Sequence, residues 1–299
     1  MSDDQPYGPQ GIGILLVLIA AIGCGATPVF TKWLIATGAP FEVISFYRFV
    51  ITAALMLPFL SLKPETFSAI AMALLAGAAM GLGWTGYAML LTKTTIVTAG
   101  IVYFAYPFFT LIFALIMIGW TPSVRGSMAA LLVIGAVIVA LQPVFLITLS
   151  WQSTLVALAA PLSFGFAAVV TAGWLQSLNP LQRLGSVTLG ACIGVLPLVL
   201  LRHPPEILIP AGDQIALIIG LGAGAALIPS FIYVVAAPRI GALKAAIAGS
   251  IELPTMAFFG WWVFQETPID HEYAAGALVI VAIILVAMSR LPKGRPPAA

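Results

Sequence analysis

The sequence predicts an all-α integral membrane protein with ten transmembrane helices in two inverted five-helix repeats. Apolar residues make up 62% of the 299 residues and charged residues only 7%, whereas soluble domains carry about 25% charged residues. Apolar runs long enough to cross a bilayer, roughly 20 residues each, recur along the whole chain. In addition, the second half of the chain repeats features of the first half.

The ten helices are predicted from the apolar runs that lie between clusters of charged residues and prolines. We expect them at residues 11–32, 43–61, 67–91, 95–118, 124–146, 152–176, 184–201, 214–237, 242–264 and 273–289. The first run follows an acidic tail, 1–10, which lacks the basic start of a signal peptide, so we expect a retained helix. Uninterrupted apolar runs exclude an outer-membrane barrel, whose strands alternate over about ten residues.

The distribution of lysine and arginine predicts the orientation, because cytoplasmic loops are enriched in both. If the N-terminus is cytoplasmic, eight basic residues are inside: Lys63, Arg125, Arg183, Arg239, Lys244, Arg290, Lys293 and Arg295. Only Lys32, Lys93 and Arg202 are at the outer ends, where long side chains ordinarily extend to the membrane surface. We therefore expect a multi-pass protein of the cell inner (plasma) membrane, with both the N-terminal tail and the C-terminal tail (291–299) cytoplasmic.

An internal repeat is visible at an offset of 146 residues, between units 11–146 and 147–290. The matched positions include Tyr87 with Tyr233, Lys93 with Arg239, and Thr121-Pro122 with Thr267-Pro268. Chance similarity between apolar sequences is the alternative, but polar and proline positions agree as well as leucine and alanine positions. Five helices in each unit would give the two units opposite orientations. Such repeats can open a site at their interface to each side of the membrane in turn.

Five prolines predict helix breaks near a cavity, because a proline in a membrane helix frees a carbonyl that needs another partner. They are Pro28, Pro107, Pro161, Pro229 and Pro254. At any one of them, a simple structural kink is the alternative.

Glu252 is the only carboxylate inside the long apolar stretches. An ionised group at the bilayer centre costs about 2.5–3.5 kcal/mol on insertion scales, so a carboxylate kept there usually has a function. We predict that Glu252 binds a substrate ammonium group or a coupling proton. The alternatives are a buried pair with a cation such as Arg48, or a protonated, hydrogen-bonded carboxyl group.

Arg48 and a set of aromatic residues are the other candidates for a substrate site. Arg48 could bind a carboxylate or phosphate through its planar fork, or it could cap neighbouring carbonyls. Tyr103 and Tyr106 lie too deep in their helix for an interfacial belt. The remaining aromatic candidates are Trp84, Tyr87, Phe164 and Tyr233. A carboxylate within aromatic walls suits amine-bearing or flat solutes, through cation–π contact and stacking.

Other function classes find little support in the sequence. The two histidines, His203 and His271, lie in outer connections, and no HExxH or Walker motif is present. No metal or other cofactor is therefore expected, and we do not expect an enzyme. The net charge of +2 without a basic patch argues against a nucleic-acid partner. Glycine-rich segments 77–81 and 220–224 lie inside apolar runs, where close helix packing is the expected role.

Four segments together resemble a known family over roughly residues 11–290. Segment 44–57 has an arginine after an aromatic residue, and 106–118 contains the proline of the fourth helix. Segment 251–266 combines a glutamate near a proline with a closing glutamate, and 274–283 begins with a Gly-Ala-Leu pattern. This order is similar to that of the ten-helix branch of the drug/metabolite transporter superfamily, with two EamA-type repeats.

Two positions depart from the family pattern. The first repeat has Gly119-Trp120 where a closing glutamate is common, so only Glu266 fits that pattern. Leu253 separates Glu252 from Pro254, whereas the family tends to have the glutamate and proline adjacent.

The resemblance implies alternating-access transport of small metabolites, with aromatic amino-acid exporters as the closest analogue. We therefore expect export of amino acids or related amines, by proton antiport or by facilitated diffusion. Membrane lipid surrounds such a protein, and its oligomeric state stays open. Lipid- or nucleotide-linked metabolites are alternative substrates. An intramembrane enzyme or a structural membrane protein are the alternatives from other classes.

Overall fold

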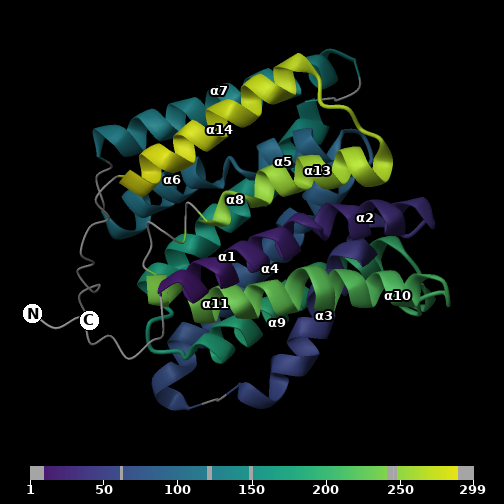
Figure 1. Ribbon diagram of the computed structural model, residues 1–299. Coiled ribbons are helices and arrows are strands. Elements are labelled where there is room, and N and C mark those ends of the chain that lie inside the picture. The colour runs from purple at the N-terminus through teal and green to yellow at the C-terminus, as the bar shows by residue number, and fades with distance from the viewer. Residues whose placement is uncertain are drawn as a thin grey trace, which may run out of the picture.

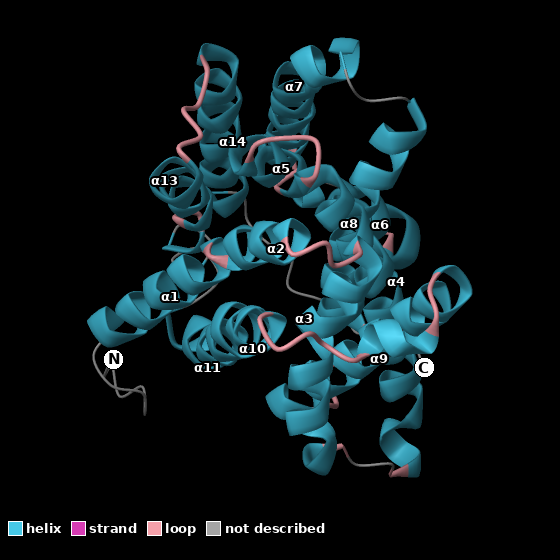
Figure 2. Ribbon diagram, turned by 90° about the vertical axis from the view of Figure 1, so that its right-hand side faces the viewer, coloured by secondary structure: helices cyan, strands magenta, loops and turns pink. Residues whose placement is uncertain are grey.

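The computed structural model describes residues 10–60, 63–119, 123–147, 151–240, 245 and 248–288. Within these ranges the regular structure is entirely helical, and eight segments are long and apolar enough to cross a membrane. The helices form one bundle, seen from two directions in Figures 1 and 2. Both predicted tails (except Gln10), Lys244, Thr121-Pro122 and the basic residues Arg290, Lys293 and Arg295 lie outside the described residues.

The main helices are long, and several follow one another with hardly any gap. In chain order they are α1 (Gln10–Gly25), α2 (Thr27–Ala36), α3 (Phe41–Met56), α4 (Phe67–Leu91), α5 (Ile96–Tyr103), α6 (Tyr106–Ile118), α7 (Val124–Ile147), α8 (Trp151–Gly173), α9 (Pro180–Arg202), α10 (Gln214–Ile219), the π-helix η4 (Gly220–Leu227), α11 (Ile228–Ile240), α13 (Glu252–Phe264) and α14 (Asp270–Met288). Short 3₁₀ turns η1 (Leu57–Phe59), η2 (Pro64–Thr66) and η3 (Pro205–Leu208) lie in the connections.

The predicted spans agree with these helices to within a few residues. The third predicted span, 67–91, has the same bounds as α4. The ninth, 242–264, falls partly on residues outside the described ranges, and its described part ends in α13. The tenth corresponds to α14. An all-helical membrane fold is confirmed, while the count of ten crossings stays a prediction.

Three of the five singled-out prolines lie in the first turn of a helix that follows an interruption. Pro28 and Pro107 are each the second residue of α2 and α6, and Pro254 is the third residue of α13. The first N–H groups of a helix have no intrahelical acceptor, so a proline removes no hydrogen bond there. The interruptions leave paired half-helices that meet inside the bundle. Pro229 instead lies where the π-helix η4 continues into α11 without a break.

Pro161 does not interrupt its helix, and the prediction of a break there was wrong. α8 runs without a break from Trp151 to Gly173 with Pro161 inside it. A single proline removes only one N–H donor from the ladder, and the surrounding helix packing can hold the remaining turns. Nearby, the hydroxyl of Ser163 donates a 2.9 Å hydrogen bond to the carbonyl of Ala160, which satisfies a polar group within the helix.

α4 lies at the centre of one side of the bundle, where it packs against α8 and α9, and α9 also packs against α3. α1 packs on α11, and α13 packs on α5 and α1. α7 and α14 pair with each other along one edge of the bundle (Figure 1). The half-helices of α1–α2 and α5–α6, the continuous segment η4–α11 and α13 therefore surround the middle of the molecule.

Glycines let α4 and α9 approach closely, as the glycine-rich segment 77–81 predicts. A Cβ on Gly77 would lie 2.0 Å from the carbonyl oxygen of Val187, and one on Gly190 would lie 2.2 Å from that of Leu74. We expect Gly77→Ala to lower stability by about 1–3 kcal/mol, the usual cost of overpacking. Gly135→Ala is the matched control, because a Cβ at Gly135 meets nothing within 4 Å. Thermal unfolding of both variants in detergent measures the difference, and equal melting temperatures would contradict the prediction.

Candidate functional site

A cavity of about 510 Å³ lies where the interrupted helices meet. Its volume is within the range of about 300–1,000 Å³ typical of small-molecule sites. Eight of the residues singled out from the sequence line it: Arg48, Trp84, Tyr103, Tyr106, Pro107, Phe164, Tyr233 and Glu252. The structure therefore brings together side chains from α3, α4, α5, α6, α8, α11 and α13.

Glu252 is the first residue of α13 and follows the turn that contains Ser250. At this position the carboxylate lies at the positive end of the helix dipole, which stabilises a negative charge. Among the described residues, its carboxylate has no ion pair within 4.0 Å and no hydrogen bond. The carboxylate faces the cavity and is available to a cation there.

Arg48 is held in place by two neighbours, neither of which is an acid. Its Nη1 donates a 3.0 Å hydrogen bond to the hydroxyl of Thr27. Its guanidinium carbon lies 3.8 Å from the centre of the Trp84 ring, close enough for a cation–π contact. Its Nε is buried and has no acceptor. The alternative of a direct Arg48–Glu252 ion pair is not realised in this conformation.

Aromatic rings form one wall of the cavity, which we call the aromatic wall: Trp84, Tyr103, Tyr106 and Phe164. The centre of the Tyr103 ring lies 5.5 Å from that of Trp84 and 5.4 Å from that of Phe164. Tyr106 and Phe164 meet edge to face at 4.8 Å. These are ordinary distances for aromatic pairs, so the rings support one another and present a fixed surface.

Tyr87 and the remaining prolines lie outside the cavity lining. Tyr87 packs behind the aromatic wall, 4.6 Å from Trp84 between ring centres, and its hydroxyl is buried without a partner. Its predicted place in the lining is therefore corrected to a second layer, because Trp84 and Tyr103 cover it. Pro254 borders a separate apolar hollow beside α1.

Several polar lining residues were not predicted: Cys24, Thr52, Thr188, Ser230 and Ser250. Thr52 lies one helical turn from Arg48, while Ser230 and Ser250 adjoin residues that the sequence had singled out. Thr52 could have been predicted from its helical spacing to Arg48. Ser230 could have been predicted because it adjoins Pro229, and Ser250 because it adjoins the Glu252 segment. Nothing in the sequence distinguishes Thr188.

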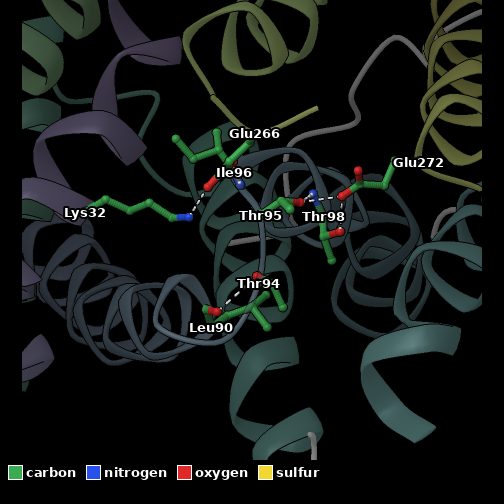
Figure 3. Close-up of polar contacts among 8 residues, drawn as sticks. All are labelled: Lys32, Leu90, Thr94, Thr95, Ile96, Thr98, Glu266 and Glu272. Atoms are coloured by element: carbon green, nitrogen blue, oxygen red, sulfur yellow. Dashed lines mark hydrogen bonds and ion pairs between the residues drawn. The ribbon is translucent and has the colours of Figure 1, made fainter. Parts of the chain in front are cut away.

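A cluster of polar contacts closes one end of the bundle (Figure 3). We call it the Lys32–Glu266 cluster and define it as Lys32, Thr95, Ile96, Thr98, Glu266 and Glu272. Lys32, expected to extend to the membrane surface, instead forms an ion pair with Glu266. The second oxygen of Glu266 accepts a 2.8 Å hydrogen bond from the Ile96 N–H. Glu266 lies two residues beyond the end of α13, so this one carboxylate ties that end of α13 to both α2 and α5.

Glu272 makes the second set of contacts in the same cluster. It accepts hydrogen bonds from the hydroxyls of Thr95 and of Thr98, the latter at 2.5 Å. Thr95 also caps α5, because its hydroxyl accepts the Thr98 N–H at 3.0 Å. The N-terminal end of α5 is thus fastened to α14 as well as to α13.

The cavity extends away from this closed end. α14 starts at the cluster with Glu272, whereas the residue that it contributes to the cavity, Ile283, lies near its other end. α9 ends beside the start of α3, where Arg202 pairs with the buried Glu42 at 2.9 Å. The cavity residues of α9 are Leu184, Val187 and Thr188, which lie near the beginning of that helix. The polar contacts thus join the helices at the Lys32–Glu266 end, and the cavity residues of α9 and α14 lie toward the opposite end.

The fold and the cavity define a polytopic helical membrane protein with a polar, aromatic-walled site between its helices. A family model, the EamA-like transporter family, matches the chain twice, over residues 11–142 and 151–288. The chain belongs to this family, which confirms the resemblance drawn from the sequence.

Two individual proteins are similar along nearly the whole chain. An S-adenosylmethionine uptake transporter of Rickettsia felis is 24% identical over 283 residues, which cover 91% of each chain. A protein of known crystal structure matches with a TM-score of 0.61 and 14% identity, covering 92% of this chain and 96% of the other. The latter likeness supports the fold alone.

Proposed function

We propose that the protein is a secondary transporter that carries small amine-bearing metabolites, amino acids among them, across the plasma membrane. The observation that carries the proposal is Glu252, a carboxylate without an ion pair within 4.0 Å among the described residues, which faces a cavity walled by aromatic rings. A carboxylate and aromatic faces together attract an organic ammonium group. No nucleophile–base pair enters the proposal, and we do not propose an enzyme.

Alternating access between two inverted repeats is the proposed mechanism. The two separate matches to one family model support a duplicated chain, and the half-helices around the cavity resemble the discontinuous helices of such transporters. The Lys32–Glu266 cluster joins residues of the first match, Lys32 and Thr98 among them, to Glu266 and Glu272 of the second. We infer that this cluster is a gate, which must separate when the site opens to its side.

The proposed orientation places both termini in the cytoplasm, as the lysine and arginine distribution predicts. The gate then lies on the outer side, and the cavity extends toward the cytoplasmic side. The predicted direction is export, by analogy with amino-acid exporters, whereas the similar Rickettsia protein is named for uptake. S-adenosylmethionine itself combines an amino-acid group with a flat ring system, so it belongs in the set of solutes to be tested.

Counterflow in proteoliposomes tests the proposal without presupposing a direction. Vesicles preloaded with one unlabelled solute are expected to accumulate the same isotope-labelled solute from outside, read by mass spectrometry. The solutes are the standard L-amino acids, polyamines, aromatic cations and S-adenosylmethionine, with protein-free vesicles as control. Accumulation of a chemically related set supports a transporter of amines. If no solute accumulates above the control, the proposal fails, and lipid- or nucleotide-linked substrates take its place. Net uptake driven by an imposed pH jump would identify proton antiport.

A further inference from the structure

Arg48 and Glu252 place two opposite charges in one cavity, and among the described residues neither has an ion partner within 4.0 Å. Two acidic side chains do have ion pairs, Glu266 with Lys32 and Glu42 with Arg202, and both pairs lie at the closed end of the bundle. Among the residues that the structure describes, the cavity therefore holds one positive and one negative group that lack an ion pair within 4.0 Å. A ligand that carries both charges would satisfy each of them.

The surroundings of Arg48 fix its position and leave part of its guanidinium free. Nη1 is bound to Thr27, whose own hydroxyl donates to the carbonyl of Ala225 at 3.2 Å. The face of the guanidinium lies 3.8 Å from the Trp84 ring centre. Neither Nε nor Nη2 has an acceptor among the described residues. A planar guanidinium held in this way is suited to a carboxylate, which it can bind through two hydrogen bonds.

Trp84 contributes both to Arg48 and to the aromatic wall. Its ring lies under the guanidinium and 5.5 Å from Tyr103 between ring centres. A solute with its carboxylate at Arg48 would therefore have its side chain next to aromatic faces. This arrangement favours apolar or flat side chains on the bound solute.

From these contacts we propose that the substrate is a zwitterion of the α-amino-acid type, with its carboxylate on Arg48 and its ammonium group on Glu252. The inference rests on the proposed transport function and narrows its substrates. Amines without a carboxylate would leave Arg48 unsatisfied, and they would be poor substrates. N-acylated amino acids would leave Glu252 unsatisfied, so they would also be poor substrates.

The test uses matched derivatives in the counterflow assay. The probes are the standard L-amino acids, their carboxamides, which lack the negative charge, and their N-acetyl derivatives, which lack the positive charge. The wild-type protein is expected to carry certain amino acids at least about tenfold faster than both derivatives, as expected for loss of a charge-assisted hydrogen bond. Arg48→Gln is expected to slow the amino acids about ten- to hundredfold and to leave the slow rate of the carboxamides almost unchanged.

Two further variants keep the test decisive if Arg48→Gln does not fold. Arg48→Lys keeps the charge but loses the fork, so we expect a weaker preference for the acid over the carboxamide. Thr27→Val removes the neighbour that holds Nη1 and should weaken the same preference without changing any charge.

Wild-type transport of carboxamides or simple amines as fast as amino acids would overturn the proposal of a zwitterionic substrate but not the proposed transport function. An equal loss for acid and carboxamide in all three variants would also overturn it. The absence of any transport by the wild type would instead contradict the proposed function.

Discussion

Glu252→Gln is expected to slow counterflow of every amine-bearing solute that the wild-type protein carries. The substitution keeps the size and shape of the side chain and removes only the negative charge. Truncating one partner of a buried charged pair costs about 2–5 kcal/mol, and each 1.4 kcal/mol is a factor of ten in affinity. We therefore expect transport at low substrate concentration to fall about 30-fold or more.

The same variant is expected to keep or raise the melting temperature. Among the described residues, Glu252 has no ion pair or hydrogen bond to lose, and an unpaired charge between membrane helices is itself destabilising. Functional groups are commonly kept at the expense of stability in this way. A structural role would produce the opposite pattern, with a lower melting temperature.

Thermal unfolding and counterflow are measured on one preparation, with Glu65→Gln as the matched control. Glu65 is exposed in the turn η2 and does not line the cavity, so the same chemical change there should alter neither quantity. Unchanged transport in Glu252→Gln would assign the site to other residues. A joint fall in stability and transport would show that Glu252 is structural.

Composition and spacing predicted the helices well because the bilayer sets both their length and their polarity. The third predicted span, 67–91, has the same bounds as α4, and charge within an apolar run was sufficient to select Arg48 and Glu252. Periodicity cannot say which neighbours a side chain meets. The sequence therefore did not separate a Glu252–Arg48 ion pair from two free charges.

The prolines show the same limit at the level of single residues. Pro107 and Pro161 look alike in sequence, yet one starts a half-helix and the other lies inside a continuous helix. Whether a freed carbonyl ends a helix depends on the partners that other helices offer, which is tertiary information. Similarly, Lys32 and Glu266 are 234 residues apart in the chain, so no local pattern predicts their ion pair.

Weakening the proposed gate is expected to expose the cavity from the closed end. Glu266→Gln removes the ion pair with Lys32 and weakens the hydrogen bond from the Ile96 N–H. A hydrogen bond to a charged group contributes about 1.5–3 kcal/mol. Its loss should therefore raise the population open at that end about ten- to 150-fold, given that 1.4 kcal/mol is a factor of ten.

Cys24 provides the reporter for this shift, because its side chain belongs to the cavity lining. In a Cys192→Ser background, a membrane-impermeant thiol reagent is applied from one side, to intact cells or to inverted vesicles. We expect slow labelling of the parent protein from the Lys32–Glu266 side and faster labelling from the opposite side. Glu266→Gln should accelerate the slow reaction, and a solute that counterflow identifies as a substrate should slow it again.

Glu206→Gln is the matched control, since Glu206 is an exposed carboxylate in η3, which follows α9 at the same end of the bundle. If it accelerates labelling as much as Glu266→Gln does, the effect is one of surface charge and the gate assignment fails. Acceleration in both Glu266→Gln and Lys32→Gln, but not in Glu206→Gln, would assign the gate to the ion pair itself. The cluster joins helices from both family matches, so its separation would couple an opening at that end to a movement of the two halves.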